Sequence, residues 1–120
     1  MAIAILDDDA AVLKALGRLL SRLGYRTELF GSAEEFLRAQ SKSKAVCLVI
    51  DIELGNGSGL ELVRQLSAKG SMLPVIFMSG SGSDEYRRQA MELGSVACLQ
   101  KPFASYLLIA AIAKAIESNR

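Results

Sequence analysis

The stretch AIAILDDD, residues 2–9, places three aspartates directly after a wholly apolar run. An apolar run of this length is typical of a parallel strand that is covered on both faces. Three more apolar runs lead to a polar side chain: residues 45–50 to Asp51, residues 74–78 to Ser79, and residues 96–99 to Lys101. Open parallel sheets bind their ligands beyond the carboxyl ends of the strands. The pattern therefore predicts one site at four strand ends.

Strand-like and helix-like periods alternate along the chain. Residues 25–30 are more polar than the other apolar runs, as expected for an edge strand, and residues 51–58 are expected to form a glycine-rich loop. The predicted strands cover residues 2–6, 25–30, 45–50, 74–78 and 96–99, and the predicted helices residues 10–23, 32–40, 59–68, 83–93 and 104–117. Five such units with short connections predict an α/β fold with a doubly wound parallel sheet.

Length and composition are those of one domain with an ordinary core. Of the 120 residues 51% are hydrophobic, and the formal net charge is +1. This charge gives no reason to expect binding to nucleic acid or a membrane, and no apolar run approaches the roughly 20 residues of a membrane helix. We therefore expect a single soluble, cytoplasmic domain over residues 1–120. Cys47 and Cys98 lie inside predicted strands and are expected to be reduced.

The aspartates after the first run indicate a metal site. Adjacent carboxylates repel one another, so gathering them costs free energy unless a cation neutralises them, and Mg²⁺ prefers hard oxygen ligands. We expect Asp7 and Asp8 to serve a metal, whereas Asp9 is equally suited to capping the next helix. Asp51 ends the most hydrophobic strand. A carboxylate there is a metal ligand, a nucleophile toward phosphorus, or both.

The other two strand ends carry groups that bind phosphate. Ser79 is followed by Gly80, and this pair can donate to a phosphoryl oxygen, although Ser-Gly is also common in turns. Lys101, before Pro102, can reach a phosphate as a point charge. Acids, a hydroxyl and a lysine together predict Mg²⁺-assisted phosphoryl transfer. The chain has no histidine, so any histidine in this chemistry must come from a partner.

These residues together resemble the receiver domain of two-component response regulators, over the whole chain. The matching positions are Asp7 and Asp8 for the family's acidic pair, Asp51 for its phosphoacceptor, Ser79 for its Thr or Ser, and Lys101 for its lysine. SGLEL at residues 58–62 and KPF at residues 101–103 are similar to receivers of FixJ and LuxR-type regulators. The resemblance implies a flavodoxin-like (CheY-like) sheet of five strands in the order 2-1-3-4-5, with five helices.

The resemblance also implies a role for each side chain. Mg²⁺ would be held by the carboxylates of Asp8 and Asp51, by Asp7 through water, and by the backbone carbonyl of Glu53. Asp51 would attack the phosphoryl group, while Ser79 and Lys101 would stabilise its equatorial oxygens. The acyl phosphate would then hydrolyse slowly. On this reading the domain is a signalling switch that controls transcription through an output domain or partner, and it is not an enzyme.

The same resemblance implies the partners. The phosphoryl donor would be a phosphohistidine on a sensor histidine kinase or a histidine phosphotransfer protein, and this domain itself would not bind nucleic acid. A homodimer or an output domain would use the last two helices and the fifth strand. Residues 106–113 are all apolar, and Tyr106 together with either Ala110 or Ala113 is expected on an exposed surface there. The alternative is a broad face buried under other helices.

Three positions depart from the family pattern. Cys98 replaces the aromatic residue that the family couples to the hydroxyl at Ser79, so we expect a weaker long-range change on phosphorylation. Leu54-Gly55 replaces Met-Pro, and with Asn56-Gly57 it is expected to loosen the loop after Asp51 without removing the Glu53 carbonyl. Glu53 also departs from the pattern by offering a carboxylate beside the acceptor. Its side chain either steers water or the metal or faces solvent, and we expect it to face solvent.

Two other functions compete with the phosphorylated switch. One is a receiver-shaped interaction module that no longer uses phosphate, which Cys98 and the altered loop favour and the intact acids disfavour. The other is a Mg²⁺ phosphatase of the haloacid dehalogenase type, suggested by Asp51-Ile52-Glu53. That family places its motif on the first strand and needs a longer chain, so the sequence disfavours it.

Overall fold

A computed structural model describes residues 1–55 and 57–118. The main sheet has five parallel strands: β1 Ala2–Leu6, β2 Arg26–Phe30, β3 Ala45–Asp51, β6 Val75–Ser79 and β7 Ala97–Gln100. Their order is β2-β1-β3-β6-β7. This confirms the predicted order 2-1-3-4-5, because β4 and β5 lie outside the main sheet. The polar strand β2 is at an edge, as its sequence predicted.

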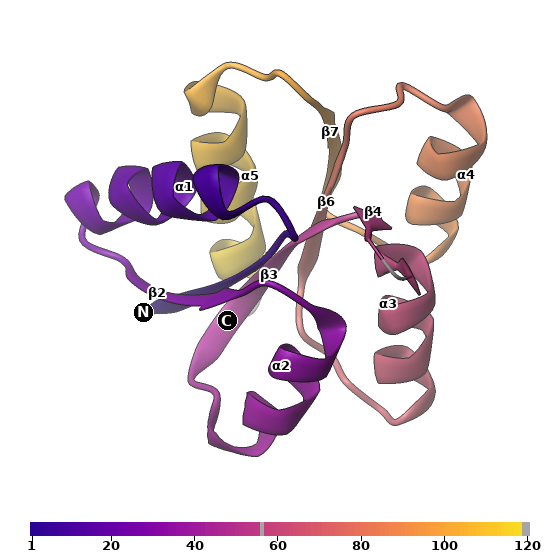
Figure 1. The fold of residues 1–120 in the computed structure, drawn as a ribbon, viewed down its shortest axis with the longest axis horizontal. Coiled ribbons are helices and arrows are strands. Elements are labelled where there is room, and N and C mark those ends of the chain that lie inside the picture. Colours follow the sequence, from indigo (N-terminus) through magenta and orange to yellow (C-terminus); the bar gives the residue numbers. More distant parts are fainter. Residues whose placement is uncertain (56, 119–120) are drawn as a thin grey trace.

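Helices cover both faces of the sheet. They are α1 Ala10–Arg22, α2 Ala33–Ala39, α3 Gly59–Ala68, α4 Asp84–Glu92 and α5 Ser105–Ser118, with a short 3-10 helix at Gln40–Lys42. Figure 1 shows α1 and α5 on one side of the sheet and α2, α3 and α4 on the other. The structure is therefore a three-layer α/β sandwich. No helix in residues 1–55 and 57–118 combines the length and apolar character that crossing a membrane requires.

The sheet divides the hydrophobic core into two clusters. Side chains alternate between the faces of a strand, so Ile3 and Ile5 of β1 join the α1 and α5 side, whereas Ala4 and Leu6 join the α2, α3 and α4 side. Each buried Ile or Leu contributes about 1.5–3 kcal/mol relative to exposure. Burial on both faces fixes the strands and hence the positions of the residues at their carboxyl ends.

The two cysteines lie on opposite faces of the sheet. Cys47 is buried in the cluster beneath α1 and α5, while Cys98 is half-buried against the other cluster. Strand β6 lies between their two strands. Both thiols are free, as predicted.

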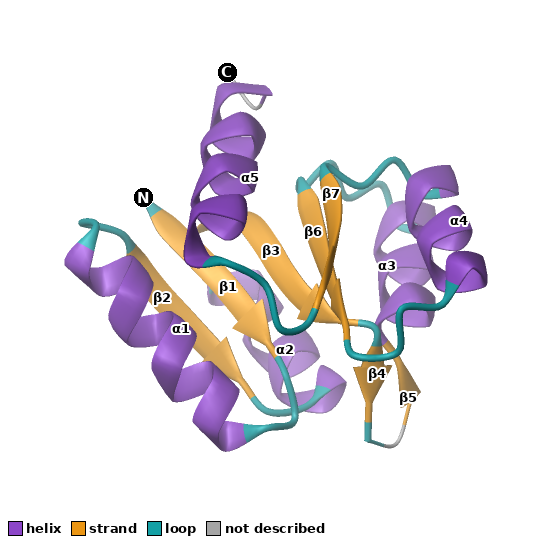
Figure 2. Ribbon diagram, turned by 90° about the horizontal axis from the view of Figure 1, so that it is seen from above, coloured by secondary structure: helices purple, strands orange, loops and turns teal. Residues whose placement is uncertain are grey.

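The segment after Asp51 differs from the expected irregular loop. Residues Glu53–Leu54 (β4) and Gly57–Ser58 (β5) pair as a two-stranded antiparallel ladder, which lies beside the carboxyl end of β3 (Figure 2). The expectation was wrong because a glycine-rich segment also suits the tight two-residue connection between antiparallel strands, which needs backbone conformations that glycine adopts readily. Asn56, to which part of the expected loosening was assigned, lies outside the described residues.

Helix α5 has an exposed apolar face, as predicted. Tyr106 is 70% exposed, and Leu107, Ala110 and Ala113 are exposed as well. The opposite stripe of the helix is buried and includes Leu108 and Ile112. The eight consecutive apolar residues therefore do not all pack against the sheet.

Candidate functional site

The strand register brings the predicted polar residues to one edge of the sheet. Leu6 pairs with Ile50, and Asp51 pairs with Met78, so the residues that follow β1 lie beside the end of β3. Ser79 pairs with Gln100. The residues after β1 and β7 and the last residues of β3 and β6 therefore meet, as the sequence predicted.

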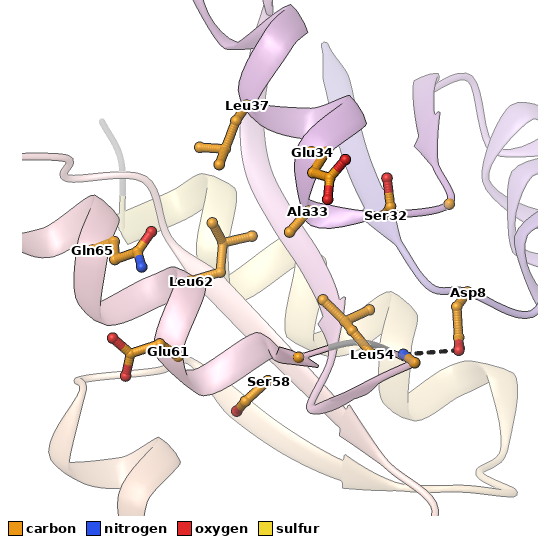
Figure 3. Close-up of a pocket in the computed structure, with 13 residues that line it drawn as sticks. Asp8, Ser32, Ala33, Glu34, Leu37, Leu54, Ser58, Glu61, Leu62 and Gln65 are labelled. Carbon is orange, nitrogen blue, oxygen red and sulfur yellow. Dashed lines mark hydrogen bonds between the residues drawn. The ribbon is translucent and has the colours of Figure 1, made fainter.

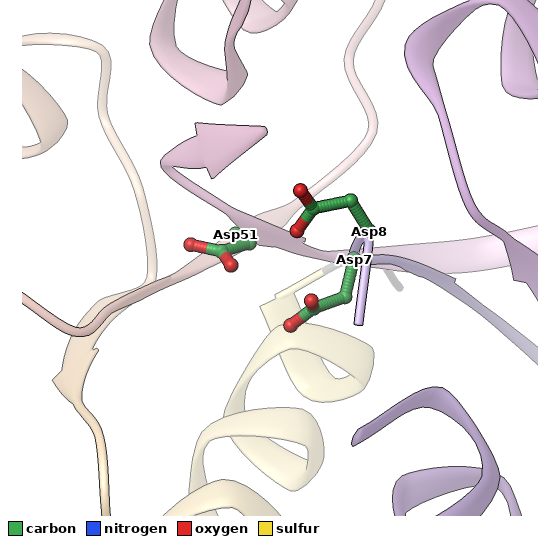
Figure 4. A group of neighbouring side chains, drawn as sticks. All are labelled: Asp7, Asp8 and Asp51. Carbon is green, nitrogen blue, oxygen red and sulfur yellow. The ribbon is translucent and has the colours of Figure 1, made fainter. Parts of the chain in front are cut away.

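Three carboxylates form a cluster at this edge. Asp7 and Asp51 are buried and Asp8 is exposed, and each offers an oxygen within 4.8 Å of the others. Figure 4 shows the three side chains beside one another, Asp7 and Asp8 beyond the end of β1 and Asp51 at the end of β3.

Backbone N–H groups hold each carboxylate of the cluster in place. Asp7 accepts from Asp9 at 2.9 Å, and Asp51 accepts from Glu53 at 3.0 Å. Asp8 accepts from Gly55 at 2.9 Å, which ties the end of β1 to the β4–β5 ladder. Such charge-assisted bonds are stronger than bonds between neutral groups. The cluster is therefore preorganised.

Asp9 caps helix α1 and is outside the acidic cluster. Its Oδ1 accepts from the N–H of Ala11 at 2.9 Å and of Val12 at 3.3 Å. These bonds satisfy N–H groups that have no partner within the helix. The capping alternative is therefore confirmed for Asp9.

Lys101 joins the two buried carboxylates. Its Nζ donates to Asp7 Oδ2 at 2.7 Å and to Asp51 Oδ2 at 3.0 Å. Its backbone N–H donates to the carbonyl of Ser79 at 2.8 Å, and the following bond to Pro102 is cis. The ammonium therefore neutralises part of the charge that the cluster concentrates.

Burial and ion pairing shift the pKa values of Asp51 and Lys101 in opposite directions. Burial raises the pKa of Asp51 above its usual value, and the hydrogen bonds from Lys101 and from the Glu53 N–H offset only part of that rise. Burial lowers the pKa of Lys101, but its hydrogen bonds to Asp7 and Asp51 outweigh burial and raise the pKa overall. Lys101 is therefore favoured in its charged form. Keeping Asp51 ionised in this buried position costs free energy, and a further cation would lower that cost.

The acidic cluster fits a hard divalent cation. All three side-chain donors are carboxylate oxygens close enough to share one ion, and Mg²⁺ binds through one or two carboxylates while retaining waters. The exposed Asp8 leaves that side of the cluster open to solvent. The donor set and burial are thus those expected of a Mg²⁺ site.

Ser79 is buried at the end of β6, and its hydroxyl is already engaged. Its Oγ donates to Glu53 Oε1 at 2.6 Å, and the N–H of Gly80 donates to Glu53 Oε2 at 3.2 Å. The prediction that the Glu53 side chain faces solvent was wrong. The reason is that the β4–β5 ladder, which the sequence did not reveal, holds Glu53 beside the end of β6.

Comparison with known proteins decides the family. Residues 3–113 match the response regulator receiver domain. The chain belongs to that family. It is 40% identical to the response regulator protein TodT of Pseudomonas putida over 115 residues, which are 96% of the chain and 51% of TodT.

FixJ proteins give a second relative and a structural match. The chain is 37% identical to the transcriptional regulatory protein FixJ of Bradyrhizobium diazoefficiens over 114 residues, covering 95% of the chain and 56% of that protein. The crystal structure of full-length FixJ from B. japonicum aligns with a TM-score of 0.91 at 35% identity, covering 99% of the chain and 59% of FixJ. The chain thus spans about half the length of these curated relatives.

Membership in the family sets the class of function. The chain is a receiver domain of a two-component response regulator, a signalling switch with an acidic site formed by Asp7, Asp8 and Asp51. A receiver domain implies a cognate histidine kinase as its partner. The acidic triad is typical of the Mg²⁺ site of receiver domains.

Gly59 is a residue of this receiver site that the sequence reasoning missed. It is the first residue of α3, and a Cβ there would lie 2.2 Å from the carbonyl oxygen of Asp51. Its N–H donates to the carbonyl of Ile52 at 2.8 Å. Only a residue without a side chain allows α3 to start this close to Asp51. A glycine directly after the N-cap Ser58 was the available signal.

Cys98 of the receiver domain lies on β7, opposite Phe77 in register and two residues before the level of Ser79. Its half-buried side chain packs against the α2, α3 and α4 side of the core. Burial raises the pKa of its thiol. A small, largely unionised thiol therefore occupies the position predicted for the aromatic switch residue.

A cavity of about 410 Å³ lies next to the acidic cluster, between α2, α3 and the β4–β5 ladder. Figure 3 shows Leu37 and Leu62 lining it, with Asp8 bonded to the backbone at one end. This cavity was not predicted, because its walls come from elements that are far apart in the chain. Its contact with Asp8 makes it part of the surroundings of the acidic site.

Proposed function

We propose that this receiver domain, over residues 1–120, accepts a phosphoryl group on Asp51 from the phosphohistidine of a sensor histidine kinase or a histidine phosphotransfer protein. The observation that carries the proposal is the position of Lys101, whose Nζ contacts both Asp7 and Asp51. This contact places a fixed positive charge beside one oxygen of the carboxylate proposed to react.

Asp51 is the proposed nucleophile. Its Oδ1 accepts from the Glu53 N–H and its Oδ2 from Lys101, so the carboxylate is held in a fixed orientation. In the transfer, a carboxylate oxygen bonds to phosphorus while the bond from phosphorus to the histidine nitrogen breaks, and the histidine keeps the electron pair. Phosphoryl transfer needs mainly such positioning and charge stabilisation. The fixed orientation of the Asp51 carboxylate provides the positioning.

Mg²⁺ is the proposed cofactor. Asp8, Asp51 and the carbonyl of Glu53 would hold it directly and Asp7 through water, and the ion would supply positive charge at the phosphoryl oxygens. Lys101 would add a second positive charge, and the Ser79 hydroxyl would donate to a third oxygen. Water would later release phosphate from Asp51 slowly, which resets the switch.

The output is proposed to be transcriptional, because FixJ is named a transcriptional regulatory protein and the chain spans only about half of it. The exposed apolar face of α5, with Tyr106 and Leu107, is the proposed surface for a homodimer or an output domain, together with α4 and β7. The domain would not bind nucleic acid itself. Its proposed location is the cytoplasm, where it can meet the kinase.

We propose that Cys98 makes signal transmission weaker than in receiver domains with an aromatic residue at this position. A thiol cannot fill or vacate the space of an aromatic ring, so movement of Ser79 would produce a weak change in the last two helices. NMR shifts of α4 and α5 with and without beryllofluoride test this. Small shifts are expected, and large shifts in both helices would contradict the proposal.

The phosphoryl-accepting function is tested with Mg²⁺ and acetyl phosphate. Intact-protein mass spectrometry should show one phosphoryl adduct on the wild type and none on Asp51→Asn. The matched control is Asp84→Asn, which changes an exposed aspartate at the start of α4 and should keep the adduct. Failure of the wild type to form an adduct would instead favour the phosphate-independent module.

A further inference from the structure

The Glu53 carboxylate binds the hydroxyl that the proposed function assigns to the phosphoryl group, and it also binds the backbone N–H next to that hydroxyl. One carboxylate oxygen accepts from the Ser79 hydroxyl at 2.6 Å, and the other accepts from the N–H of Gly80 at 3.2 Å. The inference rests on the proposed function, since it takes Ser79 as a donor to phosphoryl oxygen. In the structure, both donors are bonded to the carboxylate of Glu53.

The backbone fixes Glu53 at this position. Its N–H donates to Asp51 at 3.0 Å, and it pairs with Ser58 across the β4–β5 ladder. The carboxylate is therefore tethered between the proposed nucleophile and the end of β6. Bonds from a hydroxyl or an N–H to a carboxylate are about twice as strong as those between neutral groups. Release of Ser79 from Glu53 therefore costs free energy.

We propose that Glu53 is a positioning residue that acts as an internal competitor for the phosphoryl group. In the unphosphorylated receiver it holds the Ser79 hydroxyl and the Gly80 N–H, and it must leave both before they can contact a phosphoryl group on Asp51. A carboxylate that remained close would also repel the incoming negative charge. Glu53 thereby shifts the receiver toward its unphosphorylated state.

The first test measures beryllofluoride affinity in Mg²⁺ for the wild type, Glu53→Ala and Glu53→Gln. A hydrogen bond to a charged group contributes about 1.5 kcal/mol, so Glu53→Ala should bind roughly tenfold more tightly. Glu53→Gln, which keeps the size and loses the charge, should lie between the two. Glu117→Ala removes an equal charge from an exposed position on α5 and should bind like the wild type. Unchanged affinity of Glu53→Ala would overturn the proposal.

The second test asks whether Glu53 acts through Ser79. The same substitution is made in a Ser79→Ala background, where the hydroxyl is gone and the gain from Glu53→Ala should shrink to the part due to the Gly80 N–H and to charge. An equal gain in both backgrounds would overturn the proposed route.

The Gly80 amide gives a readout that does not depend on phosphate. Its proton resonance should move upfield in Glu53→Ala without Mg²⁺, because it loses a charged acceptor; an unmoved resonance would show that the contact is not formed. If the wild type binds no beryllofluoride at all, the proposed function fails. If it binds with the affinity of Glu53→Ala, only the role of Glu53 fails.

Discussion

Replacing Gly59 by alanine tests whether the start of α3 fixes the backbone of Asp51. The new Cβ would lie 2.2 Å from the carbonyl oxygen of Asp51 and 3.1 Å from a side-chain carbon of Ile50. Nonbonded carbon atoms normally approach to about 3.5 Å, so either α3 or the end of β3 must move. Because the nearest atom belongs to the backbone, a change of rotamer cannot relieve the clash.

The cost can be estimated from two opposing effects. Overpacking a buried site costs about 1–3 kcal/mol, whereas Gly→Ala inside a helix gains at most about 1 kcal/mol, and less at the first residue. The expected net loss in the free energy of unfolding is roughly 1–2 kcal/mol. A displacement of Asp51 by an ångström would also slow phosphoryl acceptance by up to about 100-fold.

Urea unfolding and the rate of adduct formation with acetyl phosphate measure the two effects. The matched control is Gly57→Ala, because a Cβ at Gly57 has no neighbour within 4 Å, and a surface change of this kind alters stability by less than about 0.5 kcal/mol. A Gly59→Ala protein as stable and as reactive as the Gly57→Ala protein would show that the start of α3 does not fix the backbone of Asp51.

Three further predictions concern charge and burial. Burial raises the pKa of Asp51, so ionisation of this side chain destabilises the metal-free fold. At pH 7, Asp51→Asn should therefore unfold at a higher urea concentration than the wild type. This difference should disappear as the pH falls through the raised pKa toward about 3.9, the pKa of aspartate in the unfolded chain. Lys101→Met leaves two buried carboxylates without their cation and should cost about 2–4 kcal/mol in urea unfolding without Mg²⁺, part of which Mg²⁺ restores. Burial raises the pKa of Cys47 to about 12, so a thiol reagent at pH 8 should label Cys98 first and Cys47 only after unfolding; equal labelling rates in the native protein would contradict this.

The sequence was sufficient to predict the positions of those residues whose place depends on strand order alone. Asp7, Asp51, Ser79 and Lys101 each follow or end a parallel strand, and parallel strands bring such residues to one edge of the sheet. The direction of the Glu53 side chain was mispredicted, because it depends on the two-residue ladder after Asp51. The role of Gly59 was missed because a close backbone approach leaves no periodic pattern in the sequence.

Asp51 itself is proposed to carry the phosphoryl group, and borohydride trapping identifies the residue that carries it. After incubation with Mg²⁺ and acetyl phosphate, borohydride reduces an acyl phosphate to an alcohol and releases phosphate, which converts an aspartyl phosphate to homoserine. Peptide mass spectrometry then locates the reduced residue. We expect homoserine at position 51 and nowhere else. Homoserine at position 7 or 8, or an unmodified position 51 in protein that bears the adduct, would contradict it.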